Sequence, residues 1–191
     1  MIENLFAIER FLRTITLLNQ YYLAAQKHPS LEESVVIELP FEGRWKATGA
    51  GASGRTNHHD RINSQKYAID IARVGENGKL FTGKGIEHEE SATYGATVFA
   101  PVSGEVVLVV DSLTDEPSQE RDQLAGNHIA IQFQDSLYLL LAHLQEKSVK
   151  VKVGDPVQVD DPIAKVGMSG NTDFCHLHIH IQDRRDYDIE N

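Results

Sequence analysis

The sequence predicts a mainly β domain of antiparallel strands that follows an N-terminal helix. Apolar residues recur every three or four positions over residues 4–26, which is the period of one face of a helix. From about residue 34 the pattern changes to short β-type runs interrupted by Gly, Pro, Asn and Asp, which is typical of a barrel or sandwich. We therefore expect a helical extension over residues 1–33 and a β domain over residues 34–191.

Clear turn signals separate the predicted strands. Asn77-Gly78 is a strong two-residue turn signal, and residues 111–127 form a polar, proline-containing stretch that predicts a solvated loop. The glycine-rich residues 49–59 predict a flexible approach to a pair of histidines. The predicted strands, in chain order, are residues 34–39, 66–74, 97–100, 104–111, 128–134, 137–143, 162–166 and 177–182.

The charge balance restricts the partners of this 191-residue chain. Its 28 acidic and 18 basic residues give a formal net charge of −10, which repels nucleic acid and anionic membrane surfaces. No apolar run approaches the roughly 20 residues that a membrane helix needs, so we expect no membrane span. Glu3, Glu9 and Arg10 lie where a secretory signal would be apolar, so the start does not resemble one.

Three of the nine histidines alternate along one predicted strand. Side chains at alternate positions of a strand share a face, about 6.6 Å apart per step, so His176, His178 and His180 would line one surface. Leu177 and Ile179 would pack on the other face. Because this spacing is wide for several nitrogens on one ion, we expect one histidine to bind a metal and a neighbour to act as acid or base. A strand of hydrogen-bonded structural histidines is the alternative.

Asp70 and two further histidine positions complete the set of candidate groups. Asp70 lies in an apolar run, where a carboxylate is costly unless it is hydrogen-bonded, paired or metal-bound; an outward-facing position is the alternative. His59 precedes it by eleven residues, enough for a loop to fold back, and one of the adjacent pair His58 and His59 would point away. His143 ends another apolar run, where a histidine is often structural. Two neutral nitrogens, one carboxylate and an open position for water are typical of a catalytic zinc site.

Two segments of the predicted β domain have patterns that resemble those of barrel-sandwich hybrid folds. One is residues 100–106, Ala-Pro-Val-Ser-Gly-Glu-Val, and the other is residues 151–167, which contain two Asp-Pro turns. Lipoyl carriers, sugar-transport phosphocarriers and one group of metallopeptidases share this architecture. The resemblance implies a barrel-sandwich hybrid of antiparallel strands.

Residues 40–185 resemble the lysostaphin-type zinc metallopeptidases, which are peptidoglycan endopeptidases with a duplicated hybrid motif fold. The motifs that carry the resemblance are Tyr-Ala-Ile-Asp ending at Asp70, Leu-Ala-His-Leu around His143, and Gly-Met-Ser-Gly-Asn-Thr-Asp-Phe-Cys-His-Leu-His over residues 167–178. They occur in the order that is typical of the family. This makes the resemblance far more specific than a lone His-x-His.

The resemblance implies a role for each candidate residue. One zinc ion would be held by His59, Asp70 and His178. His143 and His176 would be the catalytic groups on either side of the reacting water. The implied activity is that of a zinc metalloendopeptidase acting on peptide bonds in peptidoglycan stem peptides or cross-bridges, in the cell envelope or outside the cell.

The sequence departs from the usual family pattern at several positions. Lys66 occupies the place of the usual first ligand, four residues before the aspartate, so a variant branch with a more distant histidine is the better match. That alignment favours His59 as the ligand and leaves His58 as a possible substitute. Cys175 replaces a proline, and we expect a small buried side chain there. His180 replaces a frequent glutamate, which indicates a residue that supports a metal ligand.

Two other functions remain open from the sequence. The first is a non-enzymatic member of the same fold that binds or activates cell-wall hydrolases, and Lys66 favours it. The second is a phosphocarrier similar to the glucose-specific enzyme IIA of sugar transport, which would leave Asp70 and the alternating histidines unexplained. The sequence does not indicate the bond that is cut or the oligomeric state.

Overall fold

The computed structural model describes residues 35–51, 53–83 and 87–185. Helical structure in these residues is limited to 3-10 turns of three or four residues, none of them long and apolar enough to cross a membrane. The elements, in chain order, are β1 (Trp45–Gly49), η1 (His58–Arg61), η2 (Asn63–Gln65), β2 (Ile69–Arg73), η3 (His88–Glu90), β3 (Thr97–Phe99), β4 (Gly104–Val110), η4 (Arg121–Gln123), β5 (Asn127–Gln134), β6 (Leu137–Leu144), β7 (Pro156–Val157), β8 (Pro162–Lys165) and β9 (Leu177–Gln182).

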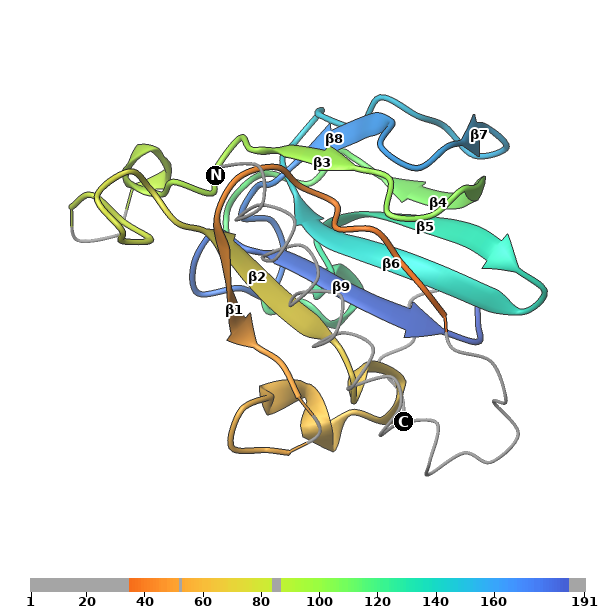
Figure 1. Ribbon diagram of the computed structural model, residues 1–191, viewed down its shortest axis with the longest axis horizontal. Helices are drawn as coiled ribbons and strands as arrows, with labels where there is room; N and C mark the ends of the chain where they lie inside the picture. Colours follow the sequence, from red (N-terminus) through yellow and green to blue (C-terminus); the bar gives the residue numbers. More distant parts are fainter. Residues whose placement is uncertain (1–34, 52, 84–86, 186–191) are drawn as a thin grey trace, which may run out of the picture.

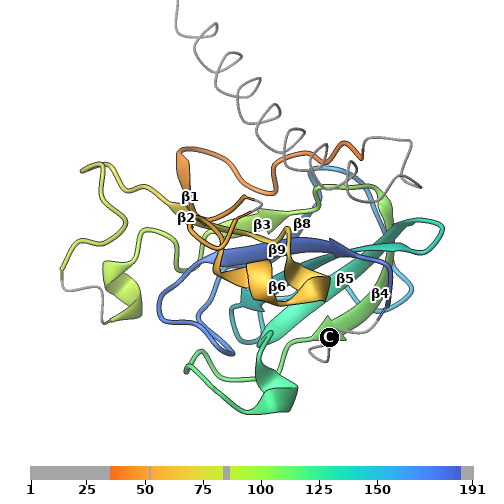
Figure 2. The same cartoon turned by 90° about the horizontal axis from the view of Figure 1, so that it is seen from below.

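The strands form one large and one small antiparallel sheet (Figure 1). The large sheet has seven strands in the order β1-β2-β9-β6-β5-β4-β7, and β3 pairs with β8 in the small sheet. The last strand, β9, therefore lies between β2 and β6 in the middle of the large sheet. Figure 2 shows the loop with η1 and η2 passing in front of β9. This arrangement places the histidine-rich strand beside the strand that contains Asp70.

The hydrophobic core lies on one face of the large sheet. Leu177 and Ile179 of β9 point into it beside Ile71 of β2, and Val98 and Ile163 of the small sheet close it. Burying one such side chain contributes about 1.5–3 kcal/mol to the free energy of unfolding. Because side chains alternate along a strand, the residues between these apolar positions point to the other face.

The prediction of a mainly β, antiparallel fold is confirmed, although the strand predicted over residues 34–39 is wrong and β1 was missed, as was the two-residue β7. Within the predicted strand 34–39, the described residues 35–39 have no strand pairing. The backbone N–H of Glu38 donates to the carbonyl oxygen of Pro101 at 2.8 Å, and proline has no N–H with which to return a bond. The missed strand, β1, is a sheet edge with mostly exposed side chains, so its sequence lacks apolar alternation. The helix and the extension predicted before residue 34 lie outside the described residues.

Candidate metal centre

Asp70 is the point at which the sheet and the preceding loop meet. It pairs with His178 across β2 and β9, and it is only 2% exposed. Its Oδ1 lies 2.9 Å from Nδ1 of His178, and its Oδ2 lies 3.0 Å from Nε2 of His59. One buried carboxylate therefore contacts one histidine from the sheet and one from the loop.

Asn57 holds the loop that carries His59. Its side-chain oxygen caps η1 by accepting the backbone N–H of His59 at 3.0 Å. Its amide nitrogen lies 2.9 Å from the carbonyl oxygen of Gly51, 3.0 Å from that of Lys66 and 3.2 Å from that of Ala68. This buried side chain therefore joins both ends of the loop to the turn that presents His59.

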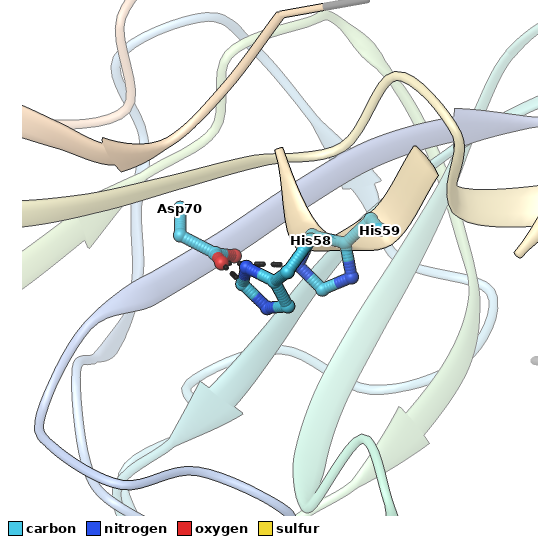
Figure 3. A group of neighbouring side chains, drawn as sticks. All are labelled: His58, His59 and Asp70. Carbon is cyan, nitrogen blue, oxygen red and sulfur yellow. Dashed lines mark hydrogen bonds and ion pairs between the residues drawn. The ribbon is translucent and has the colours of Figure 1, made fainter. Parts of the chain in front are cut away.

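His58 also turns toward Asp70, although its side chain is 71% exposed (Figure 3). Its Nε2 lies 3.5 Å from Oδ2 of Asp70, and its ring centroid is 3.9 Å from that of His59. Within the described part of the chain, His58, His59 and Asp70 form a group whose potential ligand atoms all lie within 4.8 Å of one another. A Cβ at Gly49 would lie 3.0 Å from Oδ2 of Asp70, so glycine permits this close approach.

A bulge in the sheet directs His143. Near the end of β6, two residues of this strand oppose one residue of β5, and His143 has a φ of 60°. A bulge of this kind redirects a side chain, and a positive φ in a residue other than glycine is common at functional sites. Nδ1 of His143 donates a hydrogen bond to the carbonyl oxygen of Ser169 at 2.8 Å. The neutral ring therefore carries its lone pair on Nε2.

His176 precedes β9 and lies beside both His143 and Asp70. Its Nδ1 is 2.9 Å from the carbonyl oxygen of Phe174 and 3.0 Å from the hydroxyl oxygen of Thr172. Its Nε2 is 3.5 Å from Oδ1 of Asp70, and its ring centroid is 4.8 Å from that of His143. Because a carbonyl oxygen only accepts, the proton of the neutral ring is on Nδ1 and the lone pair on Nε2 faces the carboxylate.

Burial and hydrogen bonding set the charges of the site. Burial alone raises the pKa of Asp70, but the neighbouring rings of His176, His178 and His59 outweigh it and hold this pKa well below its usual range. Burial, ahead of the neighbouring histidines, holds the pKa of His143 well below its ordinary value. Burial also lowers the pKa of His178, against the opposing effect of Asp70. The site therefore combines a charged carboxylate with two rings, those of His143 and His178, that favour the neutral form.

The alternating side chains of β9 continue beyond the metal centre. His178 Nε2 lies 2.8 Å from His180 Nδ1, and His180 Nε2 lies 2.8 Å from Oε1 of Gln182. Burial lowers the pKa of His180 to about 3. Cys175 is buried as well, and burial raises the pKa of its thiol to about 11, so this thiol stays protonated at neutral pH.

The structure brings the five predicted site residues together on one face of the sheet. Their division into ligands and catalytic groups stays a prediction, and the grouping of His58 with His59 and Asp70 keeps His58 open as a ligand. Sequence reasoning missed the residues that position the site. Gln182 continues the alternation of the histidines along β9, so the sequence contains a signal for it. No sequence pattern indicates Ser169. The five predicted residues are His59, Asp70, His143, His176 and His178.

Imidazoles and a buried carboxylate that lie close together are groups that can hold a metal ion. The sequence model of peptidase family M23 matches residues 82–188, which is more than half of the chain. The chain therefore belongs to peptidase family M23. The match includes His143, His176 and His178 but begins after His59 and Asp70, whose contact with each other is seen in the structure.

Several solved structures are similar to the chain at low sequence identity. A zinc-containing peptidase from Vibrio cholerae is 18% identical, with 82% of this chain and 41% of that one covered, at a TM-score of 0.47. The catalytic domain of the prophage-encoded M23 protein EnpA from Enterococcus faecalis is 19% identical, with 75% and 85% covered, at a TM-score of 0.48. The catalytic domain of lysostaphin from Staphylococcus simulans is 20% identical, with 72% and 78% covered, at a TM-score of 0.41.

Curated relatives of another kind match a shorter part of the chain. The glycine cleavage system H protein of Citrobacter koseri is 32% identical over 89 residues, which are 44% of this chain and 67% of that protein. The H protein of Escherichia coli strain K12 matches over the same length with the same identity. This likeness covers less of the chain than the family M23 match does.

Proposed function

We propose that this chain is a zinc-dependent endopeptidase whose substrates are peptide bonds in peptidoglycan stem peptides or cross-bridges. The observation that carries the proposal is the approach of His59 and His178 to the two carboxylate oxygens of Asp70. Membership of family M23 supports peptidase activity in general. The choice of peptidoglycan rests on the motifs that resemble those of lysostaphin-type enzymes.

The donor set of His59, Asp70 and His178, two imidazoles and a carboxylate, is of the type that binds zinc. Zinc takes imidazole nitrogen and carboxylate oxygen at about 2.0–2.2 Å, so neighbouring ligands of a tetrahedral ion lie about 3.3 Å apart. The distances of 2.9 and 3.0 Å between the histidine nitrogens and the carboxylate oxygens are close to this value. Two nitrogens in the set favour zinc over magnesium or calcium, which prefer oxygen. A zinc ion at this position would acidify a water molecule and polarise a peptide carbonyl.

His143 and His176 are the groups that would transfer protons. Each neutral ring has its proton on Nδ1, where it is hydrogen-bonded to a backbone carbonyl, and its lone pair on Nε2. Because burial lowers the pKa of His143, this ring is unprotonated at neutral pH and can accept a proton from water at Nε2. The N–H formed in this way can then be donated to the amine that leaves the cleaved bond.

The proposal is tested by incubating the zinc-loaded chain with purified peptidoglycan and identifying the products by mass spectrometry. We expect new amino ends that disappear when a chelator removes the metal and return when zinc is added. Asp70→Ala should lose both zinc and activity, because it removes the carboxylate that joins the two histidines. Asp135→Ala, at the exposed turn between β5 and β6, is the matched control and should keep both.

A non-enzymatic member of the family is the second candidate function. Two observations favour it: Lys66 at the usual ligand position, and the likeness of part of the chain to the glycine cleavage system H protein. The same experiment separates the two functions. Binding of the zinc-loaded chain to peptidoglycan with no cleavage of any peptide bond would contradict the proposed endopeptidase and favour a binding module.

A further inference from the structure

We infer that Ser169 is a positioning residue that holds His143 at the metal centre through its hydroxyl group as well as through its backbone carbonyl. This inference rests on the proposed function, because His143 is a residue proposed to transfer protons. Ser169 is fully buried and lies in the loop between β8 and β9. Its polar atoms contact both strands of the β5–β6 bulge, so one residue sets the backbone and the ring of His143 together.

The hydroxyl of Ser169 joins the two strands at the bulge. Its Oγ accepts the backbone N–H of Asn127 on β5 at 2.8 Å and donates to the backbone carbonyl oxygen of Leu144 on β6 at 2.7 Å. Asn127 and Leu144 are the paired residues at one end of the bulge, and Leu144 directly follows His143. The hydroxyl therefore fixes the position of β6 relative to β5 immediately beyond His143.

The backbone carbonyl of Ser169 holds the ring that the bulge turns into the site. Nδ1 of His143 donates to this oxygen at 2.8 Å. The oxygen only accepts hydrogen bonds, so the contact is the same whether the ring is neutral or charged. A φ of 60° is unusual for histidine and persists only where neighbouring contacts hold it. Ser169 supplies such contacts on both sides, to the ring of His143 and to the backbone of Leu144.

Gly126 allows Ser169 to come this close to the bulge. A Cβ at Gly126 would overlap the carbonyl oxygen and the hydroxyl oxygen of Ser169. Gly126 also has a φ of 60°, a conformation that glycine adopts without steric cost. The preceding residue, Ala125, accepts the backbone N–H of His143 at 3.0 Å through its carbonyl oxygen. The segment that packs on Ser169 therefore also holds the backbone of His143.

The direct test is nuclear magnetic resonance of the full chain without metal. The Cα and Cβ chemical shifts of His143 report its backbone conformation, and a hydroxyl proton protected from exchange reports the hydrogen bonds of Ser169. In the wild type we expect left-handed shifts at His143 and a detectable hydroxyl proton on Ser169. The absence of either would overturn the inference, whether or not any variant folds.

Ser169→Ala tests the hydroxyl itself. We expect the shifts of His143 to move toward extended values, because the link between the two strands is lost. Ser148→Ala is the matched control, because the hydroxyl of Ser148 also joins a backbone N–H and a backbone carbonyl, both of Lys165. This control should leave His143 unchanged. Wild-type shifts of His143 in Ser169→Ala would overturn the inference.

Gly126→Ala tests the same contact with the hydroxyl still present. The added Cβ would push Ser169 away from His143, so the shifts of His143 should move as they do in Ser169→Ala. Gly78→Ala is the control, because Gly78 has a φ of 77° but a Cβ there would meet nothing within 4 Å. Thermal melting followed by circular dichroism checks that each variant folds. Unchanged shifts in a folded Gly126→Ala chain would contradict the inference.

The functional test is a double-mutant cycle on the zinc-loaded chain with soluble peptidoglycan fragments as substrate. Ser169→Ala should lower kcat by up to about 100-fold, because a small displacement of a proton-transfer group slows the reaction. KM and zinc affinity should stay unchanged, since Ser169 acts on His143 and not on a proposed zinc ligand. In a His143→Asn chain the same change should cause little further loss. Equal losses of kcat in the two backgrounds would mean a purely structural role and would overturn the inference.

The outcomes separate this inference from the proposed function. A Ser169→Ala chain with the kcat of the wild type would overturn the inference while leaving the proposed endopeptidase intact. A wild-type chain that neither binds zinc nor cleaves peptidoglycan would overturn the proposed function. The chemical shifts of His143 and the hydroxyl proton of Ser169 would still decide whether Ser169 holds this histidine.

Discussion

The two halves of the candidate metal centre are built in different ways. Asp70 and His178 come from paired strands, where the register of β2 and β9 places their side chains next to each other. His58 and His59 come from a 3-10 turn within a loop, which depends on the side chain of Asn57. The strand half is therefore held by a hydrogen-bonded sheet, whereas the loop half is held by one buried amide.

This difference shows how a site can combine a fixed and an adjustable component. In the strand half, a change of register by one residue would turn His178 into the core and the apolar side chains of β9 out of it. Burial of these apolar side chains therefore favours the observed register. In the loop half, two adjacent histidines approach the same carboxylate oxygen from 3.0 and 3.5 Å. The choice between them depends on local contacts rather than on the sheet.

The largest expected effect is that of removing the buried histidine of the loop half. His59→Ala should lose zinc, and all activity with it, because this residue supplies the nitrogen 3.0 Å from Oδ2 of Asp70. His58→Ala should weaken zinc binding by less than about tenfold, since an exposed side chain that is not a ligand contributes less than an outer-shell partner. Metal content after dialysis and chelator competition measure both. The reverse order of effects would identify His58 as the ligand.

Replacing a proton-transfer histidine should affect turnover and leave the metal in place. His143→Asn suits the positive φ at this position, and we expect kcat to fall by about 10²–10⁴-fold with zinc still bound. Steady-state kinetics combined with metal analysis separates the two effects. His88→Ala, a histidine that stacks on Tyr94, is the control and should leave kcat unchanged. Loss of zinc from His143→Asn would mean that His143 is a ligand.

The buried rings also predict how stability depends on pH in the zinc-free chain. Burial lowers the pKa of His143 and His178, and it lowers that of His180 to about 3. The ordinary pKa of histidine in an unfolded chain is about 6.5. Below that pH the unfolded chain binds protons that the folded chain does not, so the free energy of unfolding decreases as the pH falls.

The expected size of this effect is up to about 1.4 kcal/mol per pH unit for each such histidine. For His180 the window extends from about pH 6.5 down to about 3. Asp70, with its lowered pKa, adds a further loss below about pH 4. Urea unfolding at several pH values measures the slope, and His180→Gln should reduce it. A free energy of unfolding that is constant or rises from pH 6.5 to 5 would contradict buried neutral rings.

The smallest expected effect is local and concerns the support of the loop half. Asn57→Ala should lower the free energy of unfolding by about 1–3 kcal/mol, because it leaves the loop carbonyls and the N–H of His59 without this partner. Asn57→Asp should lose less, because it still accepts the N–H of His59. Urea unfolding of both variants checks the order. Equal stability of Asn57→Ala and the wild type would mean that other contacts hold the loop.

The sequence predicted the strand half of the site better than the loop half, for physical reasons. A period of two residues along β9 is sufficient to place His176 and His178 on the face opposite the apolar residues. Asp70 is also indicated by the sequence, because a carboxylate in an apolar strand needs a partner. The choice between His58 and His59 depends on the conformation of a 3-10 turn, which short-range periodicity does not specify.

Other features of the fold were also beyond the sequence. His143 enters the site through a bulge and a positive φ, which no single residue type indicates. The edge strand β1 has mostly exposed side chains, so it shows no apolar alternation. Ser169 acts through its backbone carbonyl, which any residue would supply, so its identity gives no signal for this contact.

The most direct test of the account is a crystal structure of the zinc-loaded chain with anomalous scattering recorded at the zinc edge. The account predicts one anomalous peak, about 2.0–2.2 Å from Nε2 of His59, a carboxylate oxygen of Asp70 and Nδ1 of His178. A peak bound by His58 without His178, or no peak near Asp70, would contradict it.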